Sequence, residues 1–313
     1  METNNQKSSF LTMPDEAQVE NMMDNPVSVK HNESALMEIH NLSKNFGKLK
    51  ALDDVNLTIP RGRIIGLFGK NGAGKSTLMR CMLGFLKFEG EIMYNGHKIV
   101  HNDYHMFKKI AFIPDVNSLD DRLTVGQTIA YIKGVNPSWN DQKADRLLEK
   151  SDLPLKLKTK ALSKGMKTKL YLMLVLSLDV EFLLLDEPTI GLDIVFRKEF
   201  FNTILGEFYD ETKTIIISTH QVDEVEHILQ DIIFIDKGRI VLQEDIDVLR
   251  SRYLEVKVPR EFAEELKKHN PLQIWEGLGS VHALVEEKLD IPGAEYGAPQ
   301  LVDLFLAKIG GGK

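Results

Sequence analysis

Short, almost continuously apolar segments that end in glycine or charged residues recur along this chain. Three of them span residues 63–68, 182–187 and 214–220, and helix-like patterns separate them. Apolar strands without polar alternation are typical of a parallel sheet that helices cover on both faces. The pattern therefore predicts an α/β fold with a mostly parallel core sheet, in which ligands bind where the strands end.

Other strands are predicted from alternation and from turn residues. Apolar and polar residues alternate over 36–42 and 55–59, as in half-buried strands. Asn95-Gly96, flanked by strand-like residues, is the strongest short signal for a hairpin. Further short strands are predicted at 110–113, 232–235 and 238–242, the last two as a hairpin.

Helical patterns fill the middle of the chain. Thr124 and Gln127 have the spacing of a capping box, which predicts a helix from Val125. A second helix is expected over 140–150, and Ser163 is placed to cap a third, strongly apolar helix. We expect these helices to form an insert at about residues 115–178.

Three regions follow from these patterns. Residues 1–35 are polar, lack a sustained period and are expected to form a disordered extension. Residues 36–249 are expected to form the main domain. Residues 250–313 are expected to form a small α+β accessory domain, with strands at 253–258 and 281–285 and helices at 260–268 and 299–308.

The residues after the first apolar strand carry the clearest chemistry. Gly69-Lys70-Asn71-Gly72-Ala73-Gly74-Lys75-Ser76-Thr77 fits the pattern G-x-x-x-x-G-K-[ST]. Glycines let backbone N–H groups close around phosphates, a lysine adds positive charge there, and a serine hydroxyl can bind Mg²⁺. A helix is predicted from Ser76, so its N-terminus faces the same phosphates. The sequence thus predicts a site for a nucleoside triphosphate with Mg²⁺.

Chemical groups also end the other two apolar strands. Asp186 and Glu187 follow one strand, and His220 follows the other. Because parallel strands end at the same edge of a sheet, we expect these side chains to converge on the phosphate loop.

Taken in order, these landmarks resemble those of ATP-binding-cassette (ABC) ATPases over about residues 36–249. Leu162-Ser163-Lys164-Gly165-Met166 is similar to the family signature L-S-G-G-Q, and Gly191-Leu192-Asp193 to the loop through which two subunits sense each other's site. The resemblance implies a phosphate-loop NTPase fold with an antiparallel β-subdomain and a helical insert. It also implies a head-to-tail dimer in which two subunits share each ATP.

The resemblance assigns roles to the residues around the phosphates. Lys75 would contact the outer phosphates, Glu187 would be the general base, and His220 would contact the γ-phosphate and hold the water and base in place. Ser76 and Asp186 would hold Mg²⁺.

Other residues of the resemblance lie further from the reacting atoms. Phe46 would stack on adenine, and Ser163, Gly165 and Asp193 would contact ATP held by the other subunit. Asp115 stands where the family usually has a glutamine, and is a further candidate for Mg²⁺. An ionised carboxylate adds charge near phosphates and cannot donate a hydrogen bond, so we expect nucleotide binding to persist with altered metal dependence and coupling.

The composition of the chain limits which partners and which cellular compartment are expected. The net charge of −7 argues against broad binding to nucleic acid, and we expect no specific nucleic-acid partner. The single cysteine, Cys81, excludes an internal disulfide, suits a reducing compartment and is expected to be buried. No apolar run reaches the length of a membrane span. We therefore expect a cytoplasmic chain that meets the membrane through a partner.

The resemblance favours the ATPase subunit of a transporter that works with a separate permease. The helical insert would form the groove that grips the permease, and the C-terminal region resembles that of exporter-type (ABC-2-like) ATPases, so export is favoured over import. The alternative is a soluble ABC ATPase that acts on ribosomes or nucleic acid. Whether the second ATPase subunit is identical or a sister chain is left open by the sequence.

Overall fold

The computed structural model describes residues 35–115 and 119–310. They belong to one compact unit, Ser34–Lys313. The N-terminal extension that we expect before residue 35 lies outside the described residues, so that prediction stays open.

An antiparallel sheet contains the predicted Asn95-Gly96 hairpin. Its strand order is β2-β1-β4-β5, and both central residues of the hairpin turn have positive φ, 50° at Asn95 and 75° at Gly96, as a type I′ turn requires. This sheet is the antiparallel β-subdomain that the resemblance implied. Its strands are β1 (Ala35–Phe46), β2 (Leu49–Pro60), β4 (Glu89–Tyr94) and β5 (His97–Lys98).

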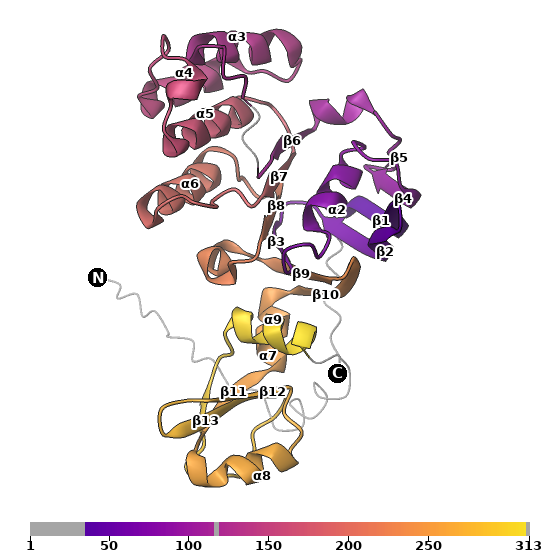
Figure 1. Cartoon of the computed structure of the whole chain (residues 1–313), viewed down its shortest axis with the longest axis vertical. Helices are drawn as coiled ribbons and strands as arrows, with labels where there is room; N and C mark the ends of the chain where they lie inside the picture. Colours follow the sequence, from indigo (N-terminus) through magenta and orange to yellow (C-terminus); the bar gives the residue numbers. More distant parts are fainter. Residues whose placement is uncertain (1–34, 116–118, 311–313) are drawn as a thin grey trace, which may run out of the picture. The chain divides into compact units, whose positions relative to one another are not determined.

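The central sheet is parallel except for one edge strand. Its order is β10-β9-β3-β8-β7-β6, and only β10 runs antiparallel to its neighbour. Figure 1 shows β3, β8 and β7 next to one another, so the three strands whose ends carry the predicted chemistry are neighbours. The strands are β3 (Ile64–Phe68), β6 (Ile110–Ile113), β7 (Phe182–Asp186), β8 (Thr214–Thr219), β9 (Asp231–Asp236) and β10 (Arg239–Asp245).

Several helices of this unit begin at capping side chains, whereas α2 begins at Gly74 without one. Thr124 and Gln127 form the predicted capping box, and Asn140, Ser163 and Asp193 each accept a backbone N–H of the helix that follows. Such caps satisfy N–H groups that have no partner within the helix. The helices are α2 (Lys75–Met82), α3 (Val125–Val135), α4 (Asp141–Ser151), α5 (Lys164–Leu176), α6 (Ile194–Glu207) and α7 (Ile246–Arg252).

The chain after β10 forms a smaller α+β region. Its sheet has the order β12-β13-β11-β14. The positions of β11, β13, α8 and α9 agree with those predicted, whereas β12 and β14 were not predicted. The expected boundary at 249/250 falls within α7, so this division of the chain stays a prediction. The elements are β11 (Leu254–Pro259), α8 (Ala263–Lys268), β12 (Gln273–Glu276), β13 (Ser280–Val285), β14 (Glu295–Gly297) and α9 (Leu301–Gly310).

Apolar clusters cover both faces of the central sheet. Alternate strand residues divide between them: Ile215 and Ile217 belong to one cluster and Ile216 to the other. Cys81 lies fully buried in the second cluster, as predicted. Burial on both faces explains why β3, β7 and β8 are apolar without alternation.

The last helix, α9, packs into the main cluster. The ring of Phe305 lies edge-on to Phe234, with ring centroids 5.0 Å apart, and to Phe68 at 6.4 Å. Phe68 is the residue immediately before the phosphate loop. The C-terminal region therefore shares a core with the strands that position the site.

Replacing Phe305 by Ala should lower the free energy of unfolding by about 3–5 kcal/mol, because it leaves a cavity between two buried rings. Leu306, on the same helix, is 44% exposed, and Leu306→Ala should change stability by less than about 0.5 kcal/mol. Urea denaturation of both variants measures the difference. Equal effects would mean that α9 does not pack as described.

Candidate nucleotide site

The predicted phosphate loop connects β3 to α2 and borders an open cavity. Gly74 has φ +115°, and a Cβ there would lie 2.9 Å from the carbonyl oxygen of Ala51, so only glycine fits. The cavity has a volume of about 690 Å³. Of the residues predicted to bind nucleotide, Phe46 and Lys70 to Thr77 line it, together with Asp115 and Glu187.

Lys75, Glu187 and His220 meet at one edge of this cavity. Lys75 Nζ lies 3.1 Å from Glu187 Oε1 and donates a hydrogen bond to the carbonyl of Gly69 at 2.7 Å. His220 Nδ1 lies 3.0 Å from Glu187 Oε2 and 3.1 Å from Oε1. Three groups predicted separately from three strand ends thus form one cluster, and the predicted convergence is confirmed.

Glu187 adopts an unusual backbone conformation. Its φ is +47°, in the left-handed region, which costs a residue other than glycine on the order of 1–3 kcal/mol. Its N–H donates to the Ser218 carbonyl at 3.0 Å and to Ser218 Oγ at 3.2 Å. These bonds to the neighbouring strand hold the carboxylate against Lys75 and His220.

Asp186 is fully buried beside this cluster. Its Oδ1 accepts a hydrogen bond from Ser218 Oγ at 2.6 Å, whereas Oδ2 has no hydrogen-bond partner among the described residues. Burial raises the pKa of Asp186, and the negative charges of Asp115 and Glu187 raise it further, while the hydrogen bond from Ser218 and the nearby hydroxyl of Ser76 oppose the shift. A buried carboxylate oxygen without a partner is suited to a cation.

The residues that resemble the signature and the sensing loop lie apart from this cavity. Ser163 caps α5 by accepting the N–H of Met166 at 3.2 Å, and Asp193 caps α6. Gly165 is next to the ring of Phe196, and none of Ser163, Gly165 and Asp193 lines the cavity. The structure therefore brings together the groups predicted around the phosphates and leaves these three residues elsewhere on the chain.

Phe46 ends β1 at the rim of the cavity. Its ring is about half exposed, and Lys44 Nζ lies over it at 4.9 Å from the centroid. An exposed ring beside a polar cavity can stack on a planar base.

Sequence reasoning missed some residues of the site. Ser218 Oγ donates to the Asp186 carboxylate and accepts the backbone N–H of Glu187, and Lys50 and Lys237 line the cavity. Ser218 lies directly opposite Asp186 in the β7–β8 pairing. Only the register of two neighbouring strands places it there, and a single strand pattern does not give that register.

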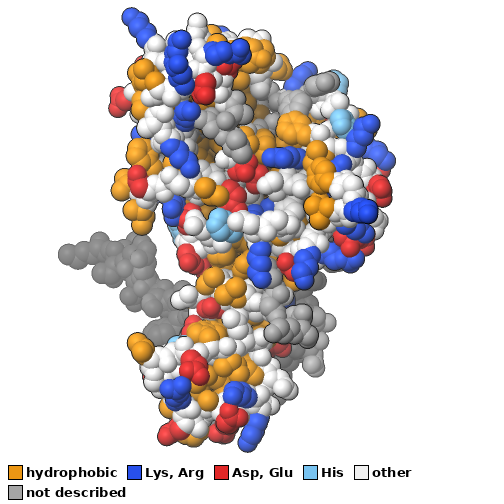
Figure 2. All heavy atoms as spheres, viewed as in Figure 1, with side chains coloured by type: hydrophobic (Ala, Val, Ile, Leu, Met, Phe, Trp, Pro, Cys, Tyr) orange, Lys and Arg blue, Asp and Glu red, His pale blue; other side chains and the backbone are white. Residues whose placement is uncertain are grey.

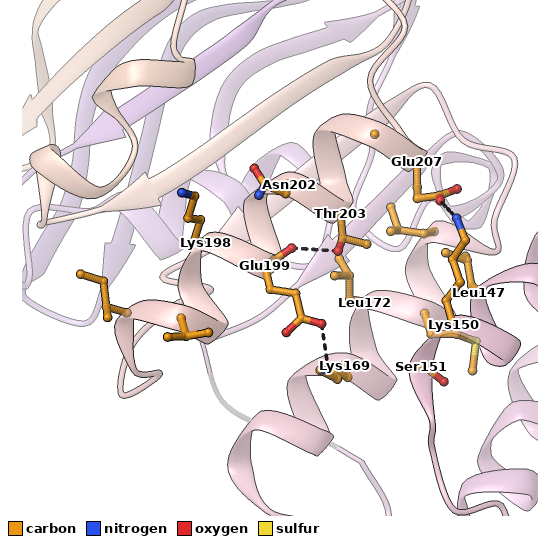
Figure 3. Close-up of a pocket in the computed structure, with 15 residues that line it drawn as sticks. Leu147, Lys150, Ser151, Lys169, Leu172, Lys198, Glu199, Asn202, Thr203 and Glu207 are labelled. Atoms are coloured by element: carbon orange, nitrogen blue, oxygen red, sulfur yellow. Dashed lines mark hydrogen bonds and ion pairs between the residues drawn. The ribbon is translucent and has the colours of Figure 1, made fainter.

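Among the described residues, two further cavities of similar size lie outside the phosphate loop. One, of about 650 Å³, is lined by α4, α5 and α6; Figure 3 shows the ion pair of Lys150 with Glu207 (2.7 Å) and that of Lys169 with Glu199 (2.8 Å) along it. The other, of about 580 Å³, is lined by residues including Phe85, Phe112 and Asp115. The second cavity shares Asp115 with the nucleotide cavity.

Comparison with known proteins agrees with this geometry. A sequence profile of the family described as ABC transporter matches residues 52–190. The lantibiotic transport ATP-binding protein SrtF of Streptococcus pyogenes is 34% identical over 215 residues, which cover 68% of this chain and 92% of SrtF. The chain belongs to the ABC transporter ATP-binding proteins. Members of this family bind and hydrolyse ATP, so this ABC protein is an ATP hydrolase.

Two other ABC proteins extend the comparison. The bacitracin transport ATP-binding protein BcrA of Bacillus licheniformis is 28% identical over 304 residues, 89% of this chain and 99% of BcrA. The structure of CbiO1 of Clostridium perfringens, part of the transporter complex CbiONQ, superposes with a TM-score of 0.58 at 28% identity, over 69% of this chain and 91% of CbiO1. The described residues contain no helix that is long and apolar enough to cross a membrane.

Removing the charge of Asp186 should stabilise the metal-free, nucleotide-free ABC protein. Because the folded-state pKa is raised, the folded chain binds more protons than the unfolded chain between the two pKa values, and its stability falls as pH rises through that window. Asp186→Asn removes this penalty, so its Tm at pH 7 should be higher than that of the wild type. The two Tm values should converge as pH falls. A lower Tm for Asp186→Asn at pH 7 would contradict the assigned cause.

Proposed function

We propose that this ABC protein dimerises head-to-tail when it binds ATP and powers a separate membrane permease, as an exporter. The contact of Lys75, Glu187 and His220 beside the phosphate loop carries the catalytic part of this proposal. The position of Ser163, Gly165 and Asp193 away from that loop supports the dimer, because these residues are free to meet nucleotide on a second subunit.

In this mechanism Lys75 exchanges one anion for another. Without nucleotide, its ammonium group pairs with Glu187 in a buried setting, with only 6% and 9% of the two side chains exposed. When phosphates enter the loop, Lys75 turns to them and releases the carboxylate. Glu187 can then accept a proton from the attacking water, while His220, at 3.0 Å, keeps the carboxylate aimed at that position.

The residues near Ser76 fit a magnesium ion. The Ser76 hydroxyl and the unpartnered Oδ2 of Asp186 are oxygen donors, which Mg²⁺ prefers. Among the described residues no group of three or more His, Cys, Asp or Glu side chains could hold a metal alone, so we propose that nucleotide phosphates complete the site. Bound Mg²⁺ neutralises charge that develops on the phosphates. Asp115 is near enough to raise the pKa of Asp186 and would add to the negative charge that the cation offsets.

The cavity near Asp115 is the proposed contact with the permease. It is lined by apolar side chains from α3, α5 and β6, and Asp115 lies at its boundary with the nucleotide cavity. A permease helix seated there would touch the residue that replaces the usual glutamine. In this proposal, the chain lies at the inner face of the cell membrane only because it binds the permease there. Figure 2 shows basic side chains over the surface of α3 to α5, which we interpret as a solvated face.

Two relatives support transport as the function, and we propose that its direction is out of the cell. SrtF and BcrA are named for lantibiotic and bacitracin transport, and the match to BcrA extends over 304 residues and therefore includes most of the C-terminal region. A soluble ABC ATPase that works on ribosomes or nucleic acid is the alternative that the experiments below must exclude.

Glu187→Gln should lower kcat for ATP hydrolysis by about 10²–10⁴, the usual contribution of a general base. The amide keeps the size of the side chain but cannot accept the proton, so ATP should stay bound and hold two subunits together. Gel filtration with ATP and Mg²⁺ should then show a dimer. A variant that stays monomeric with bound ATP would contradict the head-to-tail proposal.

Phe85→Glu should abolish recovery of the permease when the tagged protein is purified from gently solubilised membranes, because a charge would enter the apolar cavity. Phe85 is 42% exposed and lines that cavity, whereas Tyr131, 61% exposed, does not. Tyr131→Glu is the matched control and should still recover a polytopic membrane protein. Recovery of the wild type with ribosomes alone would favour the alternative function.

A further inference from the structure

A short turn after β8 joins two loops of the nucleotide site through one carboxylate. The turn is η3 (Val222–Glu224), two residues after His220. Glu224 Oε2 accepts a hydrogen bond from Thr189 Oγ1 at 2.9 Å, and Oε1 pairs with Arg197 of α6. One carboxylate thus receives donors from two other segments, the loop after β7 and helix α6.

Arg197 extends this contact to the loop that resembles the sensing loop. Its Nη2 donates to the carbonyl of Leu192 at 3.1 Å, and its backbone N–H donates to the carbonyl of Asp193 at 3.0 Å. A guanidinium group has donors in a fixed planar arrangement, so one residue can hold a carboxylate and a carbonyl in a defined relation. Glu224 therefore reaches Leu192 through a single side chain.

The pair of Glu224 and Arg197 is largely shielded from water. Only 9% of the Glu224 side chain and 27% of the Arg197 side chain are exposed. Breaking a shielded ion pair by removing one charge leaves the other uncompensated, so such a pair tolerates little movement of its partners. Surface pairs in this chain, such as Lys267 with Glu264, lack that constraint.

The loop from Glu187 to Asp193 is consequently attached to the segment 220–224 at two places. Glu187 contacts His220 at the beginning of the loop, and Thr189 donates to Glu224 further along. Arg197 of α6 then connects Glu224 to Leu192. Two attachments prevent the loop from rotating about either one. Leu192, the neighbour of Asp193, is thereby linked to the segment that carries His220.

We infer that Glu224, acting through Arg197 and Thr189, is a positioning residue that keeps the sensing loop in register with Glu187 and His220. Glu224 does not line the nucleotide cavity, so it would act on hydrolysis only through other residues. This inference rests on the proposed function, since the loop matters for hydrolysis only where a second subunit contacts it. Loss of the Glu224 charge would let the loop shift and misplace the groups that complete the site.

Glu224→Gln tests the inference by removing the charge while keeping the size of the side chain. We expect kcat to fall about tenfold or more, because a misplacement of about 1 Å can lower the rate on the order of 100-fold. KM for ATP should stay within about threefold, because Glu224 does not line the nucleotide cavity and ground-state binding is retained. A fall in kcat with KM retained distinguishes a positioning role of Glu224 from a general loss of structure.

Glu226→Gln is the matched control. Glu226 lies in the next turn, η4 (Glu226–Ile228), and pairs with Arg250 at 2.6 Å without contacting the sensing loop. Its kcat should equal that of the wild type. Equal kcat values for Glu224→Gln and Glu226→Gln would overturn the inference.

Thr189→Val provides a second variant if Glu224→Gln unfolds. Thr189 is buried, and valine has a similar shape without the hydroxyl that donates to Glu224. Its kcat should fall in the same direction by a smaller factor, again with KM retained. An unchanged kcat for this variant would also overturn the inference.

Measuring dimer formation distinguishes failure of the proposed function from failure of the proposed role of Glu224. In the Glu187→Gln background, we expect ATP to produce less dimer with Glu224→Gln added than with Glu226→Gln added. If Glu187→Gln alone gives no dimer, the proposed function fails whatever Glu224 does. If it gives a dimer that both added substitutions leave equal, the role of Glu224 fails and the proposed function stands.

Discussion

The parallel pairing of β3, β8 and β7 is the constraint on which the site depends. Phe68 lies opposite Thr219, and Asp186 lies opposite Ser218, so the three strands end at the same level of the sheet. Each strand is buried on both faces, and a shift of one residue would move its apolar side chains into the wrong cluster. Apolar packing therefore sets the alignment that brings a lysine, a carboxylate and an imidazole within hydrogen-bonding distance.

The electrostatics of the site follow from that alignment. Lys75 and Glu187 satisfy each other in the absence of phosphate, whereas Asp186 has one carboxylate oxygen without a partner among the described residues. A buried acid in this state is less stable charged than it would be in water, as its raised pKa records. Without nucleotide, the charge of Lys75 is therefore compensated by Glu187, whereas the charge of Asp186 lacks a compensating cation. A cation bound to the phosphates would compensate the charge of Asp186, and the phosphates would replace Glu187 as the partner of Lys75.

Much of this arrangement could be predicted from the sequence, because local rules are strong where strands end. The phosphate loop, Asp186, Glu187 and His220 were each found from a strand pattern followed by a chemical group, and the capping box at Thr124 and the hairpin at Asn95-Gly96 follow from short-range hydrogen bonding and turn geometry. These features depend on residues near one another in the chain.

The features that could not be predicted depend on pairs distant in the sequence. Ser218 acts on Asp186 only through strand register, and Glu224 meets Arg197 and Thr189 only after β7 and β8 have paired. The left-handed φ of Glu187 likewise has no local signal, because a glutamate rarely adopts it without bonds such as those to Ser218.

The packing of Phe305 also has a mechanical consequence. Its ring contacts Phe68, the residue that immediately precedes Gly69, and Phe234 of β9, which pairs with β3. Helix α9 therefore packs directly against the strands that carry the phosphate loop. A displacement of α9 would be transmitted to β3 through the packed rings of Phe305 and Phe68, next to the first residue of the loop.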